Sequence, residues 1–260
     1  MAVLVLSAVL YMLCIFLPVI IVEQIMGLWS VMEYALEEYV QIFYDLNYTA
    51  INDWALTYSD KLNFSFATFL YLLFVPGPLT FGLSVIWLRV IRGREVFSDT
   101  VFSGFSAFFR VVSMDTLRRI FMILWSFLLV IPGIIAYYRF SLAFFLILDN
   151  PEMKSFEALT LSKYYMQQNK MSRFLLDFSF IGWFILSAFA FYAVSAGAAA
   201  LILASGNELS LFASMFSRAI IGAIIFAPVF AYRGVAAAEY YHRVICRDPK
   251  SFPELPQITE

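Results

Sequence analysis

The sequence predicts an all-α fold: a polytopic transmembrane helical bundle of about six passages, which include a Pro-Gly helical hairpin, with amphipathic helices at the interface. Composition indicates a membrane protein, because 62% of the 260 residues are hydrophobic and 14% are charged, whereas roughly 45 to 50% of the residues of soluble domains are apolar. Charge patterning indicates several passages, because uncharged runs of spanning length alternate with acidic and basic segments. Lys and Arg concentrate on the cytoplasmic side of such proteins.

The first uncharged run, residues 2–22, is long enough to span and lacks the basic leader of a signal peptide, so we expect an anchor. Residues 23–63 hold seven acidic side chains and one lysine, which places this acidic segment outside the cytoplasm. Its apolar residues recur at helical spacing and predict an amphipathic helix on the outer surface, packed on the bundle or binding a partner. These residues are Trp29, Met32, Leu36, Val40 and Phe43.

A second span, residues 64–91, is interrupted by Pro76, Gly77 and Pro78, and basic residues follow it. Prolines within a membrane helix free backbone carbonyls, which must find another partner, so this span is expected to be buried in the bundle. Residues 92–119 are basic and aromatic, with a helix cap at Ser98 or Asp99. They predict a cytoplasmic interfacial helix that contacts the bilayer and its anionic lipid headgroups.

The helical hairpin is predicted from the uncharged run Ile120–Tyr138, which Pro132 and Gly133 interrupt. The segments on both sides of this run are basic and therefore cytoplasmic, so the chain must cross an even number of times between them. We place the tip of the hairpin at Pro132-Gly133. The second arm, Ile134–Leu148, reaches only about 22 Å, so one arm is short or the hairpin is re-entrant.

A second cytoplasmic interfacial helix is predicted within residues 149–173, with Asn150 as its cap and Pro151 at its first position. A broken membrane helix followed by an amphipathic helix thus occurs twice, as a weak repeat. Two further spans follow, residues 174–204 and about 211–241, and we expect Pro228 to break the helix of the latter. We expect one transmembrane domain, residues 1–250, with both termini cytoplasmic and a disordered tail at 251–260.

Several sequence blocks resemble an uncharacterised family of bacterial integral-membrane proteins, domain of unknown function 975. The resemblance is carried by IPGI, by DNP with the EAL helix that follows it, and by blocks that begin at Pro76, Phe102 and Leu176. It extends over roughly residues 64–185. The resemblance implies a membrane fold in the bacterial cytoplasmic membrane, and it implies no reaction.

Arg139 and Arg233 are the strongest candidates for a functional role. Each lies roughly 15 Å of helix from a cytoplasmic boundary, where an arginine costs about 2.5 to 3.5 kcal/mol and needs a partner or a wet cavity. Asp177 and Glu239 are the available carboxylates. We hypothesise that Arg139 with Asp177, and Arg233 with Glu239 or a carbonyl, line a polar cavity under the helix breaks. The alternative is that both arginines snorkel or lock the bundle.

No motif for hydrolysis, phosphate binding or metal binding occurs. The absence of these motifs predicts no enzyme activity and no cofactor. The chain has two distant cysteines and a single histidine, His242, so we expect no metal site. Its basic residues are interleaved with apolar ones beside the spans, which favours anionic lipid over a nucleic-acid partner. Two functions remain open. The chain is a permease or channel-like protein for a small solute, ion or lipid, or it is a scaffold or accessory subunit with a membrane-protein partner.

Overall fold

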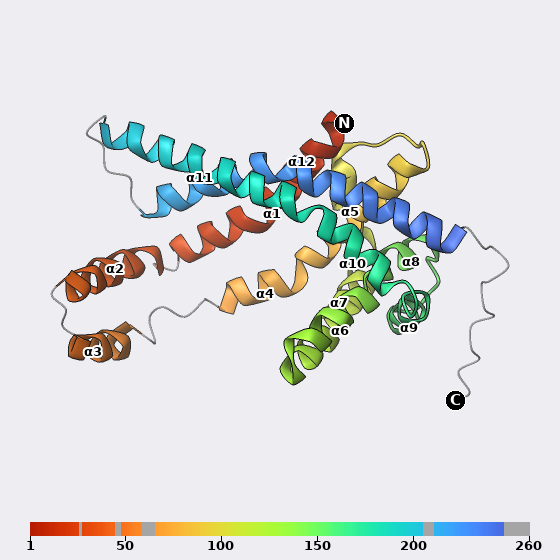
Figure 1. Ribbon diagram of the computed structural model, residues 1–260, viewed down its shortest axis with the longest axis horizontal. Coiled ribbons are helices and arrows are strands. Elements are labelled where there is room, and N and C mark those ends of the chain that lie inside the picture. Colours follow the sequence, from red (N-terminus) through yellow and green to blue (C-terminus); the bar gives the residue numbers. More distant parts are fainter. Residues whose placement is uncertain (26–27, 45–47, 59–65, 205–210, 247–260) are drawn as a thin grey trace. The chain divides into compact units, whose positions relative to one another are not determined.

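A computed structural model describes residues 1–25, 28–44, 48–58, 66–204 and 211–246 (Figure 1). Every regular element in these ranges is a helix, and they contain no strand, so the predicted all-α class is confirmed. The chain divides into two compact units. The first unit consists of Met1–Tyr11, Pro76–Ser187 and Phe226–Glu260, and the second of Met12–Val75 and Ala188–Ile225. The predicted tail, 251–260, lies outside the described residues.

Five helical stretches among the described residues are long and apolar enough to cross a membrane. These stretches are Ala2–Ile25, Phe66–Ile91, Val130–Asp149, Lys170–Ile202 and Ala213–Ile245. The chain is therefore built as the sequence predicted, from apolar helices of spanning length. The number of passages stays a prediction.

The second unit contains most of α1 (Ala2–Ile25), together with α2 (Leu28–Tyr44), α3 (Tyr48–Tyr58) and α4 (Phe66–Phe74). The helix predicted within the acidic segment is present as α2, and the Trp54 indole of α3 donates a hydrogen bond to its Ala35 carbonyl (2.8 Å). Its location outside the cytoplasm stays a prediction. Leu36, Val40 and Phe43 are exposed, whereas the side chains of Trp29 and Met32 lie outside the described ones.

Glu23 belongs to the last turn of α1 and is buried. The Thr68 hydroxyl of α4 donates a hydrogen bond to its carboxylate. The acidic segment predicted for residues 23–63 therefore begins inside a helix, because α1 continues past Glu23 to Ile25.

Helix α5 (Pro76–Ile91) forms the core of the first unit, where almost all residues from Gly77 to Leu88 are buried. The break between α4 and α5 falls at Val75, and Pro76 opens α5, where its missing amide costs nothing. The segment predicted as an interfacial helix begins as a 3-10 helix, η1 (Ser98–Ala107), packed on α5. A Cβ at Gly82 would overlap the Val101 carbonyl, and one at Gly104 the Pro78 carbonyl. This backbone contact holds η1 on α5.

Helices α6 (Phe108–Leu128) and α7 (Val130–Arg139) form the predicted hairpin (Figure 1). Its turn lies at Leu129, which is fully extended (φ −169°, ψ 157°), and not at Pro132-Gly133 as predicted. Pro132 instead occupies the first turn of α7, where a proline breaks no helical hydrogen bond. It therefore helps to begin the second helix, and the turn between the helices comes before it. Gly133 lets α7 approach α6, because a Cβ there would overlap Ser126.

Helix α8 (Ala143–Asp149) is buried and contacts α5 and α9 (Ser155–Tyr165). The break between α7 and α8 is bridged by the buried Ser162 hydroxyl of α9, which accepts from the Leu142 amide (3.2 Å) and donates to the Arg139 carbonyl (2.9 Å). The predicted cap at Asn150-Pro151 is wrong. Helix α9 begins at Ser155, because Glu157 accepts a hydrogen bond from the Lys154 amide (3.1 Å) and closes its first turn.

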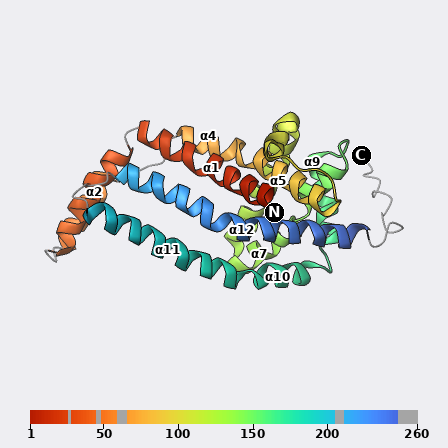
Figure 2. The same ribbon diagram turned by 90° about the horizontal axis from the view of Figure 1, so that it is seen from above.

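Helices α10 (Lys170–Ser179) and α11 (Ile181–Ala204) meet at Phe180, and α12 (Leu211–Cys246) follows. Helix α12 continues through Pro228 (Figure 2), so this proline is not the break that we predicted. A membrane helix tolerates such a proline because nearby groups can take over the freed carbonyl. In the first unit α12 packs closely on α5, since a Cβ at Gly234 would overlap the Trp87 indole.

Candidate functional site

Three aspartates of the first unit each lie against arginines: Asp115, Asp149 and Asp177. All three lie in or next to apolar helices, where an ionised side chain is expensive unless it is paired or wet. Around each of the three, the neighbouring arginines outnumber the single carboxylate.

The Asp177 cluster consists of Asp177 and Arg173 on α10, Arg233 on α12 and Tyr137 on α7. Arg233 holds Asp177 with both ends of its guanidinium, Nε to Oδ1 at 2.9 Å and Nη2 to Oδ2 at 3.2 Å. Nη2 of Arg233 also donates to the Tyr137 hydroxyl (3.0 Å). Planar two-point pairing of this kind fixes the guanidinium in one orientation. The cluster therefore joins three membrane helices.

Arg173 is the unusual member of the cluster. Arg173 is only 6% exposed, and its Nη2 lies 3.7 Å from Asp177 Oδ1, beyond hydrogen-bond distance. Its Nε and Nη1 have no hydrogen-bond partner among the described residues. The Tyr240 ring, 5.6 Å from Cζ, covers one face of the guanidinium. A buried arginine thus keeps unused donors beside a carboxylate that Arg233 already occupies.

The structure brings together two of the four residues predicted for a polar cavity, Arg233 and Asp177, in a pairing that the sequence hypothesis did not contain. Arg139 does not meet Asp177; its guanidinium stacks on the Trp125 ring at 5.4 Å. Glu239 does not meet Arg233; it pairs with Arg243 one turn away in the same helix (2.7 Å). Neither expected pair forms: Arg139 is held by the Trp125 ring, and Glu239, six residues after Arg233, lies on another face of α12.

The Asp115 cluster consists of Asp115, Arg118 and Arg119 on α6. Asp115 is 2% exposed, and Arg118 binds its Oδ1 at 2.7 Å while Arg119 binds Oδ2. Gly77, next to the predicted helix break, lies directly against this carboxylate: a Cβ there would be 3.1 Å from Asp115 Oδ2. The lack of a side chain at Gly77 therefore leaves room for a buried acid that was not predicted from the sequence.

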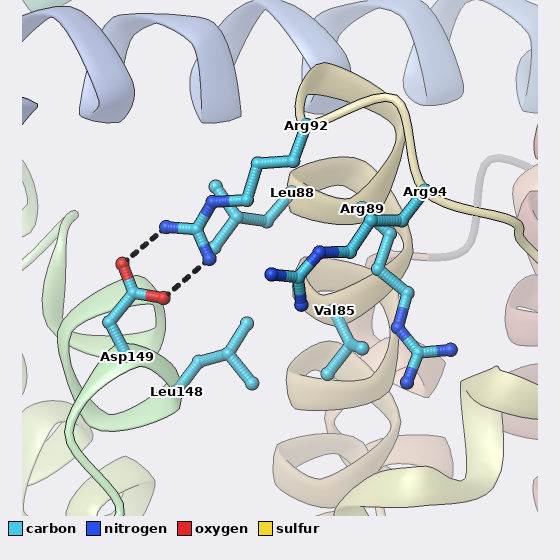
Figure 3. Close-up of a pocket in the computed structure, with 7 residues that line it drawn as sticks. All are labelled: Val85, Leu88, Arg89, Arg92, Arg94, Leu148 and Asp149. Atoms are coloured by element: carbon cyan, nitrogen blue, oxygen red, sulfur yellow. Dashed lines mark hydrogen bonds and ion pairs between the residues drawn. The ribbon is translucent and has the colours of Figure 1, made fainter.

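Asp149 closes α8 beside a pocket of about 240 Å³ (Figure 3). Arg92 holds it by two bonds, Nη1 to Oδ1 at 2.8 Å and Nη2 to Oδ2 at 2.6 Å, and the Tyr241 hydroxyl of α12 donates to Oδ2 at 2.9 Å. The pocket is also lined by Arg89 and Arg94. In Figure 3 the guanidinium groups of Arg89 and Arg94 take no part in the ion pair between Arg92 and Asp149.

The chemistry of these clusters favours anions over cations. Within the described ranges, no group of three or more His, Cys, Asp and Glu side chains could hold a metal ion. An excess of guanidinium groups offers planar donors, which suit carboxylate and phosphate oxygens. Asp115, Asp149 and Arg173 were not predicted from the sequence as site residues. The signal for Asp115 and Arg173 was present, since Asp and Arg stand three or four residues apart on one helix in both cases.

Residues 127–248 match the family model described as "Protein of unknown function (DUF975)". The resemblance inferred from sequence is confirmed, but its bounds differ: we expected 64–185, whereas the match begins later and continues to residue 248. The match covers just under half of the chain and includes Asp149 and the whole Asp177 cluster. Neither the curated proteins nor the solved structures contain a match to the chain.

Proposed function

We propose that the chain is a permease or channel-like membrane protein for a small anionic solute. The proposal rests on the site alone, since the family that residues 127–248 match has no known function. The observation that supports this is Arg173, a buried guanidinium with two unused donor groups beside an occupied carboxylate. In this proposal the cluster binds the solute and performs no covalent chemistry.

The charge of the Asp177 cluster favours an anion. Arg173 and Arg233 carry two positive charges against the single negative charge of Asp177. An uncompensated buried charge costs several kcal/mol, and a bound anion removes that cost. A carboxylate or phosphate also accepts from the two donor groups that Arg173 leaves unused. The solute class is therefore a small carboxylate or phosphate.

The Asp177 cluster lies a short length of helix from the basic residues that we assign to the cytoplasmic face, so a solute can reach it from the cytoplasm. Asp177 lies about 10 Å of helix from Lys170, and Arg233 about 15 Å from Arg243. Helix α10 ends close to the cluster, at Phe180. Interrupted helices of this kind line the substrate sites of many secondary transporters.

We propose further that the α6–α7 hairpin is re-entrant. Its apolar arms, Ile120–Leu128 and Val130–Tyr138, are bounded by Arg119 and Arg139, and each rises only about 14 Å. The hydrocarbon core is about 30 Å thick. A hairpin of this size reaches mid-membrane and returns, which leaves four full crossings: α1, α4–α5, α10–α11 and α12.

Four crossings place both termini in the cytoplasm of a bacterial cell, with the basic ends of the helices at the cytoplasmic face. That arrangement brings the basic segments 92–119 and 149–173 to anionic lipid headgroups. In this topology the acidic segment, residues 23–63, lies outside the cytoplasm. The topology agrees with the positive-inside distribution along the chain.

The alternative function is a scaffold or accessory subunit. The observation that favours it is the hairpin tip, where Phe127, Leu128, Val130 and Ile131 are each at least 68% exposed. Such a tip fits lipid, and it equally fits an apolar face of a partner membrane protein. In this alternative the Asp177 cluster only locks α7, α10 and α12 together.

The test is electrogenic transport in liposomes that contain the purified full chain, measured as transient currents on a solid-supported membrane. Jumps from gluconate to acetate, succinate, phosphate or sulfate provide the probe anions. We expect a current for at least one of them, lost in Arg173→Gln and retained in Arg243→Gln, an arginine exposed at the end of α12. Currents no larger than those of empty liposomes, or equal in wild type and Arg173→Gln, would overturn the proposal.

A further inference from the structure

The pocket beside Asp149 has an unbalanced charge. Its wall contains three arginines and one aspartate, and Asp149 is already held by Arg92 and Tyr241. The guanidinium groups of Arg89 and Arg94 make no hydrogen bond or ion pair within the part of the chain that the structure describes. Like charges gathered around one hollow repel each other, and a bound anion would relieve that repulsion.

The backbone at the end of α5 is shaped so that Arg94 shares this pocket with Arg89. Gly93 has a positive φ of 65° and donates to the Val90 carbonyl at 3.1 Å. The Arg94 amide donates back to the Arg89 carbonyl at 2.9 Å. This pair of bonds is the Schellman ending of a helix, which folds the next residue back over the last turn. Arg89 and Arg94, five positions apart in the sequence, therefore line the same pocket.

We propose that this pocket binds a phosphate group, with Arg89 and Arg94 as its ligands and Arg92 held in place by Asp149. The volume of about 240 Å³ corresponds to about eight water molecules, enough for a phosphate with its substituent. Val85, Leu88 and Leu148 give the pocket an apolar wall. The phosphate therefore comes from an anionic lipid headgroup or from a free phosphate. The inference is independent of the Asp177 cluster, since the two sites share no residue.

Binding is measured on the full chain in a neutral detergent, with dihexanoyl phosphatidic acid as the lipid probe and inorganic phosphate as the free probe. We expect saturable binding of one probe molecule per chain, weakened at least about tenfold in Arg89→Gln/Arg94→Gln. The matched control is Arg110→Gln, which removes an arginine that does not line the pocket. This variant is expected to bind like the wild type.

The two probes distinguish the source of the phosphate. Binding of both, in competition, assigns the site to free phosphate; binding of the lipid probe alone assigns it to a headgroup. Both results support the proposal. Absence of saturable binding to the wild type, or equal binding by the double variant, would overturn it and leave the arginines as partners of the α5 C-terminal dipole only.

A second measurement needs no variant, so it remains decisive if the double variant does not fold. The wild-type chain is treated with phenylglyoxal, an arginine reagent, with and without saturating probe, and modified residues are located by peptide mass mapping. We expect the probe to protect Arg89 and Arg94 and to leave Arg110 reactive. Equal modification of Arg89 and Arg94 in both conditions would contradict the proposal.

Discussion

Arg233 and Asp177, on α12 and α10, form a two-point ion pair whose shorter contact, Nε to Oδ1, is 2.9 Å. The carboxylate is 10% exposed, so little water is available to replace the arginine. Arg173 stands at the same carboxylate without a hydrogen bond to it. A single buried acid therefore keeps two arginines in place, and its removal affects both.

Asp177→Asn is expected to destabilise the fold by about 3 kcal/mol, because it leaves the buried Arg173 and the partly buried Arg233 without a counter-charge. Adding Arg233→Gln should recover part of this loss, since the double variant removes one of the two orphaned charges. The free energy of unfolding is measured by SDS titration in mixed micelles. As a control, Arg243→Gln breaks an exposed pair within one helix and should cost no more than about 0.5 kcal/mol. Equal costs for the two single variants would mean that Asp177 is hydrated.

Gly82→Ala and Gly104→Ala should each destabilise the first unit by at least about 3 kcal/mol. The added Cβ would meet a backbone carbonyl of Val101 or Pro78, so η1 would have to separate from α5. The same titration measures the loss. Gly182→Ala is the matched control, because nothing lies within 4 Å of the Cβ that it adds. It should be neutral or stabilising by up to about 1 kcal/mol. Wild-type stability in either of the first two variants would refute the close contact.

Ser162→Ala should cost about 1 to 3 kcal/mol, because it leaves the Leu142 amide and the Arg139 carbonyl without their bridging hydroxyl in a buried place. Amide hydrogen exchange of residues 139–143 should become faster in this variant. Thr160→Ala is the control: its hydroxyl is exposed and bonds only to its own helix, at the Phe156 carbonyl. Unchanged exchange at residues 139–143 in Ser162→Ala would mean that the Ser162 hydroxyl does not stabilise the break between α7 and α8.

Hydropathy and charge predicted the helices and the hairpin because both patterns are local. The position of the turn was missed by a few residues, since a proline both breaks a helix and begins one, and Pro132 begins α7. The 3-10 form of η1 depends on Gly82 and Gly104 touching a distant backbone, and no local pattern contains that contact.

The pairing of charges was the least predictable part of the site. Arg139 and Arg233 are equivalent in the sequence, each a single arginine within an apolar run. Which of them meets Asp177 depends on how α7, α10 and α12 are rotated about their axes, and a neighbouring ring, Trp125, takes Arg139 instead. Arg173 was counted only as a flanking positive charge, because its burial arises from tertiary packing.

The re-entrant hairpin predicts that its tip is closed to water on both faces of the membrane. Leu129→Cys, in a chain whose Cys14 and Cys246 are replaced by alanine, should not react with a membrane-impermeant maleimide in whole cells or in inverted vesicles. The tip stops near mid-membrane because its arms rise only about 14 Å.

Two exposed positions serve as controls for the labelling. Glu152→Cys, between α8 and α9, should react only in inverted vesicles, and Glu37→Cys, in α2, only in whole cells. Reaction of Leu129→Cys in whole cells would mean that the hairpin crosses the membrane completely and that the topology has six passages.

The most direct test of the anion site is native mass spectrometry of the full chain, extracted gently from its own membrane. The account predicts that the wild type and Arg243→Gln retain a small anion, one per chain, and that Arg173→Gln has lost it. A wild-type mass equal to that of the polypeptide alone, from a preparation that still retains other non-covalent adducts, would contradict a solute site at Arg173.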